Sequence, residues 1–195
     1  MKKINLLFFL MFTIYTFSQQ RNYGISTSII MSKVEKSEEF NGGGSPGYRV
    51  GLFYEHELNN SFGLKSTLAI GKMQDGYYND FFRNGTPNIF RTNLDLITLL
   101  RFYVKSNYSK GLFLTIGPRF TYINSALNDK NDVKFLYNET NFGLLFGFGF
   151  NTSEFFQIEF EADYGFTDIL STSEFKSKTL AGNITFSYDI SHLLK

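Results

Sequence analysis

The sequence has no cysteine, so disulfide bonds cannot contribute to the stability of the fold. It has only 3 prolines and little excess of either charge, with a formal net charge of +1 at pH 7. This balance produces no strong field that would attract nucleic acid or an acidic substrate. Beyond the N-terminal residues, no stretch approaches the roughly 18 consecutive apolar residues of a transmembrane helix, which excludes a bundle of such helices. Stability must therefore come from burial and from backbone pairing.

The N-terminus has the three parts of a secretory signal peptide. Lys2 and Lys3 begin it, an apolar run follows over residues 4–12, and small residues end it near Ser18. The apolar run is shorter than the roughly 20 residues that a membrane-spanning helix needs. We expect residues 1–18 to be removed, which leaves residues 19–195 as one domain with a net charge of about −1. The alternative is a retained N-terminal anchor helix.

Residues that favour β-sheet are abundant: the chain has 24 Phe, 12 Tyr and 17 Gly. Apolar residues alternate with polar or small ones in segment after segment. Over residues 61–73, for example, Phe62, Leu64, Leu68 and Ile70 fall on one face of an extended chain. This period of two predicts eight strands, at residues 22–32, 48–58, 61–73, 92–104, 111–124, 141–151, 155–167 and 179–190.

The lengths of these strands and of their connections indicate a membrane barrel. Each predicted strand has about 10 to 13 residues, close to the 9 to 11 that cross a bilayer when tilted. The long connections 33–47, 74–91 and 125–138 alternate with the short ones 59–60, 105–110 and 152–154, and the last connection is 168–178. We therefore predict an all-β fold, an eight-stranded antiparallel up-and-down transmembrane β-barrel in the cell outer membrane. Its long loops lie outside, and its turns and both termini lie in the periplasm.

The bulk of the side chains predicts which strand face meets lipid. Large side chains such as Phe146 and Phe148 share the apolar face, whereas glycines such as Gly147 and charged residues share the other. Small and charged residues suit a narrow interior, and a lysine or arginine facing lipid near the midplane would cost roughly 2 to 4 kcal/mol. His56 and Lys72 are exceptions on the lipid face, and both fall at strand ends. The alternative is a soluble lipocalin-like barrel that binds an apolar ligand, which requires Phe146 and Phe148 to point inward.

The predicted interior face carries charges of both signs. Buried charges without partners cost several kcal/mol each, so we expect these side chains to pair and to close the lumen to solutes. Pro118 falls in the middle of a predicted strand, and because proline has no N–H to donate we expect a β-bulge there. The predicted charge network consists of Arg49, Glu55, Glu57, Lys65, Asp95, Arg101, Arg119, Glu159, Glu161 and Asp163, with Asp189 near one end.

Several segments resemble a known family. Residues 93–103 read NLDLITLLRFY, an apolar strand that ends in a basic residue and aromatics, and residues 114–122, 142–150 and 161–169 match in character. In these segments the chain resembles the PorT-like outer-membrane β-barrel proteins of the Bacteroidetes, also described as porin-family proteins. The resemblance implies the fold and the location. The namesake of the family is associated with protein secretion and surface maturation, but the resemblance carries over no functional residue.

The C-terminus departs from this resemblance. Such barrels commonly finish on an aromatic residue that the insertion machinery reads, whereas this chain continues past Tyr188 to residue 195. Either the insertion signal is internal, or the last strand ends later than residue 190.

No group of residues has a recognised catalytic, cofactor-binding or metal-binding pattern. Glu159, Glu161 and Asp163 share one strand face, as carboxylates in acid–base catalysis do, but we interpret them as members of the charge network. Lipid-cleaving barrel enzymes need a serine with a histidine, and the chain has only His56 and His192. We expect no catalytic residue, no cofactor and no metal.

We therefore expect a non-enzymatic, monomeric outer-membrane barrel with a structural or interaction role, exerted through the extracellular loops or the periplasmic rim. Its expected partners are outer-membrane lipid and other envelope proteins, not nucleic acid. The alternatives are the soluble lipocalin-like binder, a lipid-modifying barrel enzyme and a narrow conducting pore.

Overall fold

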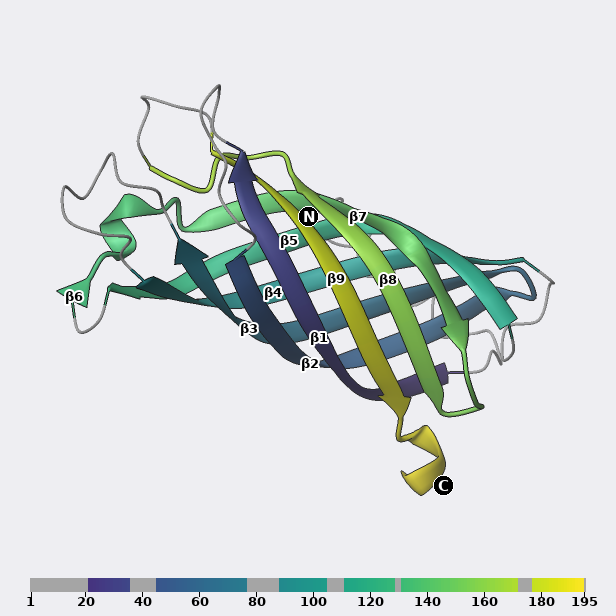
Figure 1. Cartoon of the computed structure of the whole chain (residues 1–195). Helices are drawn as coiled ribbons and strands as arrows, with labels where there is room; N and C mark the ends of the chain where they lie inside the picture. The colour runs from purple at the N-terminus through teal and green to yellow at the C-terminus, as the bar shows by residue number, and fades with distance from the viewer. Residues whose placement is uncertain are drawn as a thin grey trace, which may run out of the picture.

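The alternating segments of the sequence form eight long strands (Figure 1). The computed structural model describes residues 21–35, 45–76, 88–104, 111–128, 131–171 and 177–194, and the predicted signal peptide over residues 1–18 lies outside them. The long strands are β1 (Arg21–Glu35), β2 (Ser45–Asn59), β3 (Phe62–Gly76), β4 (Asn88–Tyr103), β5 (Gly111–Asn128), β7 (Thr140–Asn151), β8 (Phe156–Gly165) and β9 (Lys178–Asp189). The shorter elements are β6 (Asn131–Asp132) and the 3-10 helices η2 (Lys134–Leu136) and η3 (Ser191–Leu194).

The long strands form one antiparallel sheet that closes on itself. The strand order is β4-β3-β2-β1-β9-β8-β7-β5, and β4 also pairs with β5, so every long strand has two neighbours. β1 pairs with β9 from Gly24 opposite Asp189 to Glu35 opposite Lys178, which joins the first strand to the last. The predicted eight-stranded antiparallel barrel is confirmed.

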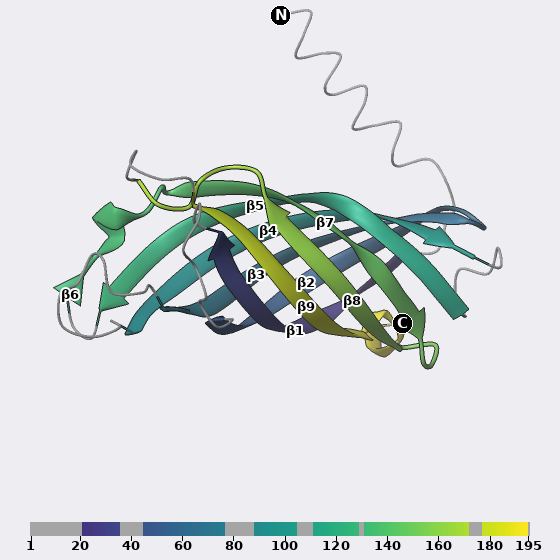
Figure 2. The ribbon, with the colours of Figure 1, turned by 45° about the horizontal axis from the view of Figure 1, so that its top comes forward.

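The two ends of this barrel differ. β1 begins and β9 ends at the end where the turns at 60–61 and 152–155 lie, and we call this the turn end. Strands β1, β3, β5 and β8 end at the opposite end of the barrel, which we call the loop end. Figure 2 shows β6 and the adjoining η2 at the loop end, and the C-terminus at the turn end.

Strands β1 to β5 extend further toward the loop end than the sequence predicts, whereas β8 ends at Gly165, two residues before the predicted end. β4 begins at Asn88 and pairs with β3 as far as Gly76, and β5 continues to Asn128. The predicted loops 74–91 and 125–138 are therefore wrong at their edges. Toward the loop end, the alternation of apolar and polar residues stops before it reaches Asp75 in β3 and Arg91 in β4. The backbone pairing between these two strands continues past both residues.

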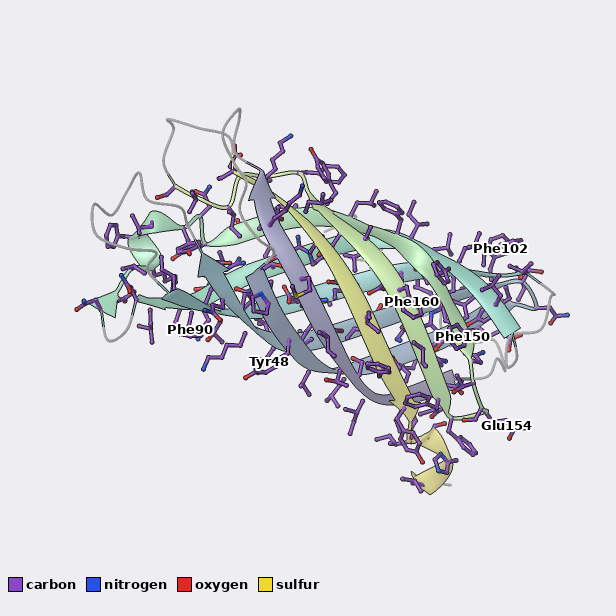
Figure 3. All side chains as sticks on the ribbon, in the orientation of Figure 1. Tyr48, Phe90, Phe102, Phe150, Glu154 and Phe160 are labelled. Carbon is purple, nitrogen blue, oxygen red and sulfur yellow. The ribbon has the colours of Figure 1, made fainter. Side chains whose placement is uncertain are left out.

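Strand alternation sends the large apolar side chains outward. Phe146 and Phe148 lie on the outer wall with about half of their surface exposed, 52% and 46% respectively. Figure 3 shows Phe102 and Phe150 on the outside of the wall toward the turn end, and Tyr48 and Phe90 toward the loop end. The lipocalin-like alternative required Phe146 and Phe148 to point inward, and the structure contradicts it.

Pro118 lies in β5 without a β-bulge, so that prediction is wrong. β5 pairs with β4 at Arg119 opposite Ile97 and again at Ile116 opposite Leu100. The two pairs are three residue steps apart on both strands, so neither strand has an extra residue between them. The ladder therefore skips the pairs at Pro118 and Gly117 and keeps its register. The backbone at Gly117 approaches the Thr98 carbonyl so closely that a Cβ there would overlap it. The glycine makes this close approach possible beside a residue that has no N–H to donate.

The chain turns away from the sheet after β9. The strand ends at Asp189, whose carboxylate accepts a hydrogen bond of 2.7 Å from the Ser191 N–H, and η3 follows. The ring of His192 lies 4.0 Å from that of Phe155, centroid to centroid, so the C-terminal turn packs on the outside of the turn end. The last strand does not end later than residue 190, so this explanation of why the chain does not finish on an aromatic residue is wrong. Among the described residues, no helix is long and apolar enough to span a membrane.

Candidate functional site

The candidate site is the interior face of the barrel, where alternate residues of every long strand point. Nine of the ten predicted network residues lie there with 7% or less of their surface exposed, and Asp189 is also buried. Glu57, the tenth, is only half-buried, because it lies next to the turn at the end of β2. The buried network residues divide into a cluster near the turn end and a cluster near the loop end.

The turn-end cluster is built around Arg101 of β4, which has no exposed surface. Its Nη1 lies 2.6 Å from Oε1 of Glu55 on β2, and its Nη2 lies 2.7 Å from Oε1 of Glu159 on β8. The same Glu159 oxygen lies 2.5 Å from Nζ of Lys65 on β3. Lys65 also donates a hydrogen bond of 2.7 Å to Ser187 of β9. Side chains from five strands thus meet in the middle of the barrel.

Aromatic rings close the turn-end cluster. The guanidinium of Arg101 lies 4.4 Å from the ring centre of Phe113, and Nζ of Lys65 lies 4.6 Å from that of Phe53. The Tyr103 hydroxyl donates a hydrogen bond of 2.8 Å to Glu55, and its ring contacts Phe113. These cation–π and hydrogen-bond contacts satisfy charges that burial would otherwise penalise.

The loop-end cluster contains two further ion pairs. Nε of Arg49 lies 2.8 Å from Oδ2 of Asp95, and Nε of Arg119 lies 2.7 Å from Oδ2 of Asp163. The Thr121 hydroxyl connects them, because it accepts a hydrogen bond from Arg119 and donates one to Asp95. Each ion pair joins strands that are not neighbours in the sheet, so the contacts cross the lumen rather than follow the wall.

Glu161 lies between the two clusters in sequence and has a different environment. Its Oε2 accepts a hydrogen bond of 3.2 Å from Thr185, whose hydroxyl in turn lies 2.9 Å from that of Ser28. Within the described part of the chain, no lysine or arginine lies within ion-pair distance of it. The interpretation of Glu159, Glu161 and Asp163 as one equivalent ladder therefore needs refinement, since the middle carboxylate is held by hydroxyl groups.

A third charged group lies above the loop-end cluster, and the sequence analysis missed it. Nε of Arg91 lies 3.0 Å from Oδ2 of Asp75, which also accepts a hydrogen bond of 3.1 Å from the Tyr137 hydroxyl. Counting in steps of two from Asp95 and Lys65 would have placed Arg91 and Asp75 on the inner face. This period of two is present in the sequence, but Arg91 and Asp75 fall in segments that were predicted to be loops.

The connections at the loop end fold over this group. Val133 and Tyr137 follow β6, and together with Ile169 after β8 they form a buried apolar cluster with Ile89, Ile123 and Ala126 at the ends of β4 and β5. An isolated β-bridge between Tyr137 and Leu170 joins the two connections. The described parts of these two connections thus pack together over Arg91 and Asp75.

The space left inside is small. A cavity of about 30 Å³ lies between Arg49, Arg91, Arg119 and Asp95, and that volume is large enough to hold water. No three His, Cys, Asp or Glu side chains gather to hold a metal in the described ranges. The ion pairs around this cavity connect strands of the wall through the interior.

The comparisons with known proteins agree with this geometry. A family model described as outer membrane protein beta-barrel domain matches residues 9–171. The crystal structure of Neisserial surface protein A is similar, with 9% identity, a TM-score of 0.60, and coverage of 86% of this chain and 97% of that one. The Ail attachment invasion locus protein of Yersinia pestis has 15% identity, a TM-score of 0.52, and coverage of 88% and 99%. At these identities the likeness shows the fold alone. A search of curated protein sequences found no match.

Proposed function

Because the chain belongs to the outer membrane protein beta-barrel domain family and lies in the outer membrane, we propose that it acts there as a non-enzymatic interaction protein. In this proposal the barrel is a closed, monomeric scaffold that holds the connections at its loop end in a fixed arrangement outside the membrane. The partners are other envelope proteins, and lipid covers the apolar wall.

The exposure of Phe135 is the observation that carries the proposal. Its side chain is 75% exposed, more than any other large apolar side chain that the structure describes. It lies in η2, next to Lys134, whose Nζ is 5.2 Å from the ring centre of Tyr122, an outward aromatic residue of β5. A phenylalanine in water is costly unless a partner covers it, since burial of a large apolar side chain contributes about 1.5–3 kcal/mol.

The surroundings of Phe135 hold it in place. Val133 and Tyr137 on either side are buried in the apolar cluster at the barrel mouth. Nζ of Lys134 lies 3.2 Å from Glu139, and the Ser171 hydroxyl donates a hydrogen bond of 2.8 Å to the Phe135 carbonyl. An aromatic residue on a backbone held in this way loses less entropy on binding than one on a free loop, and aromatic residues are enriched among those that dominate protein interfaces.

The resemblance to PorT-like proteins supports a finer version of this proposal. In that version the partner belongs to the machinery of protein secretion or surface maturation, as the namesake of the family does. The Ail protein is named for attachment and invasion, which also take place at the cell surface. The cell-surface setting in the name of the Ail protein supports a role at the loop end.

A photo-crosslinking amino acid at position 135 tests the proposal in living cells. We expect discrete crosslinked species that contain an envelope protein. The same amino acid at Glu154, an exposed turn-end position, is the matched control (Figure 3). Crosslinks to a protein at position 154 and none at position 135 would indicate that the interaction takes place at the periplasmic rim. An absence of protein crosslinks at both positions would overturn the interaction role.

The enzyme alternative is tested separately. A lipid-modifying barrel would depend on a histidine, and His192 lies against the rings of Phe155 and Tyr188 at the turn end. We expect cells that produce His56→Ala or His192→Ala to have the same lipid A and phospholipid profiles as cells with the unchanged protein. A changed profile in either strain would contradict the non-enzymatic proposal.

A further inference from the structure

A groove lies on the outer wall at the loop end, across β2, β3 and β4. It has a volume of about 370 Å³, and its lining includes Pro46, Tyr48, Lys72, Gln74 and Phe90. Figure 3 shows Tyr48 and Phe90 on this stretch of the wall. Lys72 is the one charged residue among the described residues that line the groove, and none of them is acidic.

The strand register explains how the groove is formed. Lys72 lies directly opposite Tyr48 on β2 and Thr92 on β4, and Gln74 lies opposite Phe90. The lysine therefore has an aromatic ring on one side and a second ring diagonally above it on the other. Both rings can contact a ligand that reaches the lysine.

The depth of Lys72 in the bilayer follows from strand geometry. Ten residue steps of β3 separate it from Phe62, and at about 3.3 Å per residue they span roughly 33 Å along the strand. A tilt of about 40° reduces this to roughly 25 Å along the barrel axis, the usual height of the apolar band. Phe62 packs against Phe102 at the turn end, with ring centroids 5.3 Å apart. Lys72 therefore lies at the opposite edge of the band, where lipid headgroups begin.

Two other lysines near this rim, Lys134 and Lys178, have different surroundings. Lys134 pairs with Glu139, and Lys178 lies opposite Glu35 in the register, with its Nζ 5.9 Å from the ring centre of Tyr164. Around Lys72, by contrast, the described groove is apolar or uncharged. An anionic group from outside the protein is the natural counterion for a lysine in this position.

We propose that this groove binds a lipid of the outer leaflet through an anionic phosphate of its headgroup. The phosphate pairs with Nζ of Lys72, and Tyr48, Phe90 and Gln74 contact the rest of the headgroup. The acyl chains continue down the wall over Val50 and Ile70, which pair with each other below the groove and are exposed at 49% and 62%. The site depends on membrane location and not on a protein partner, so it is independent of the role assigned to Phe135.

Native mass spectrometry of the folded protein in detergent micelles tests this site, with diphosphoryl lipid A as the probe and phosphatidylcholine as the uncharged comparison. We expect the unchanged protein to retain one lipid A in preference to phosphatidylcholine. Lys72→Gln should weaken that retention about fivefold, the effect of one lysine at a membrane surface, whereas Lys72→Arg should keep it. Lys33→Gln, which removes an exposed outward lysine on β1, is the matched control and should behave as the unchanged protein.

Three results would overturn the proposal. Equal retention by the unchanged protein and by Lys72→Gln would show that the groove does not bind the phosphate. An equal loss in Lys33→Gln would show attraction by the whole rim and not by one site. Displacement of lipid A by inorganic phosphate would show a site for the free ion. Heat-modifiable migration on gels verifies that each variant is folded before it is compared.

Discussion

Nζ of Lys65 and Oε1 of Glu159 lie 2.5 Å apart, although β3 and β8 face each other across the full width of the barrel. Four strand positions separate them in either direction around the sheet. The pair, with Arg101 bound to the same oxygen, therefore acts as a brace between opposite walls.

Breaking this brace should destabilise the barrel. Lys65→Met leaves Glu159 buried with one cation instead of two, and we expect a loss of about 3–5 kcal/mol in the free energy of unfolding. In the double variant with Glu159→Gln, the loss should be smaller than the sum of the two single losses, with a coupling energy of about 1–3 kcal/mol. The chain has no tryptophan, so urea unfolding is followed by far-ultraviolet circular dichroism. Additive losses would contradict a direct interaction.

Two glycines of the wall should respond differently to the same substitution. A Cβ at Gly117 would overlap the Thr98 carbonyl of β4, so Gly117→Ala should cost about 1–3 kcal/mol. Gly182 on β9 has no atom within 4 Å of an added Cβ, so Gly182→Ala should change stability by less than about 0.5 kcal/mol. Urea midpoints of the two variants, measured in the same lipid, provide the check. Equal midpoints would mean that the backbone at Gly117 can move away.

A charged residue on the outer wall should lower the free energy of unfolding more at the middle of the apolar band than at its edge. Leu68 is exposed on the wall of β3 near the middle of the apolar band, and Leu68→Arg should cost about 2–4 kcal/mol in a bilayer. Thr92→Arg, beside Lys72 at the edge, should cost about 0–1 kcal/mol. The test compares unfolding free energies of both variants in lipid vesicles. A similar cost at both positions would be inconsistent with the assigned band.

The interior should not conduct ions. Ion pairs connect non-neighbouring strands through the interior in both clusters, and the cavity near Arg49 has a volume of only about 30 Å³. We expect the conductance of planar bilayers that contain the purified protein to equal that of the bare membrane, with a large porin as the positive control. Stepwise single-channel openings would support the narrow-pore alternative instead.

Much of the fold was readable from the sequence because the signals are local. The segment 141–151 was predicted within one residue of β7, since its phenylalanines and glycines alternate without interruption. The prediction failed where polar residues interrupt the pattern, as at Asp75 and Arg91, which lie in strands that continue above the apolar band. It also failed at Pro118, where a missing donor suggested a bulge and the ladder instead keeps its register.

The sequence by itself determined the strand period, the bulky outward face and the charged inward face, because alternation and side-chain size are properties of neighbouring residues. Only the tertiary structure decided which charges meet. Lys65 and Glu159 are 94 residues apart and pair because the closed sheet sets their strands opposite each other at one height. The same closure left Glu161 to a hydroxyl group and placed Lys72 in a groove between Tyr48 and Phe90. Partners in a barrel interior are fixed by strand number, tilt and register together, and none of these is encoded in a single segment.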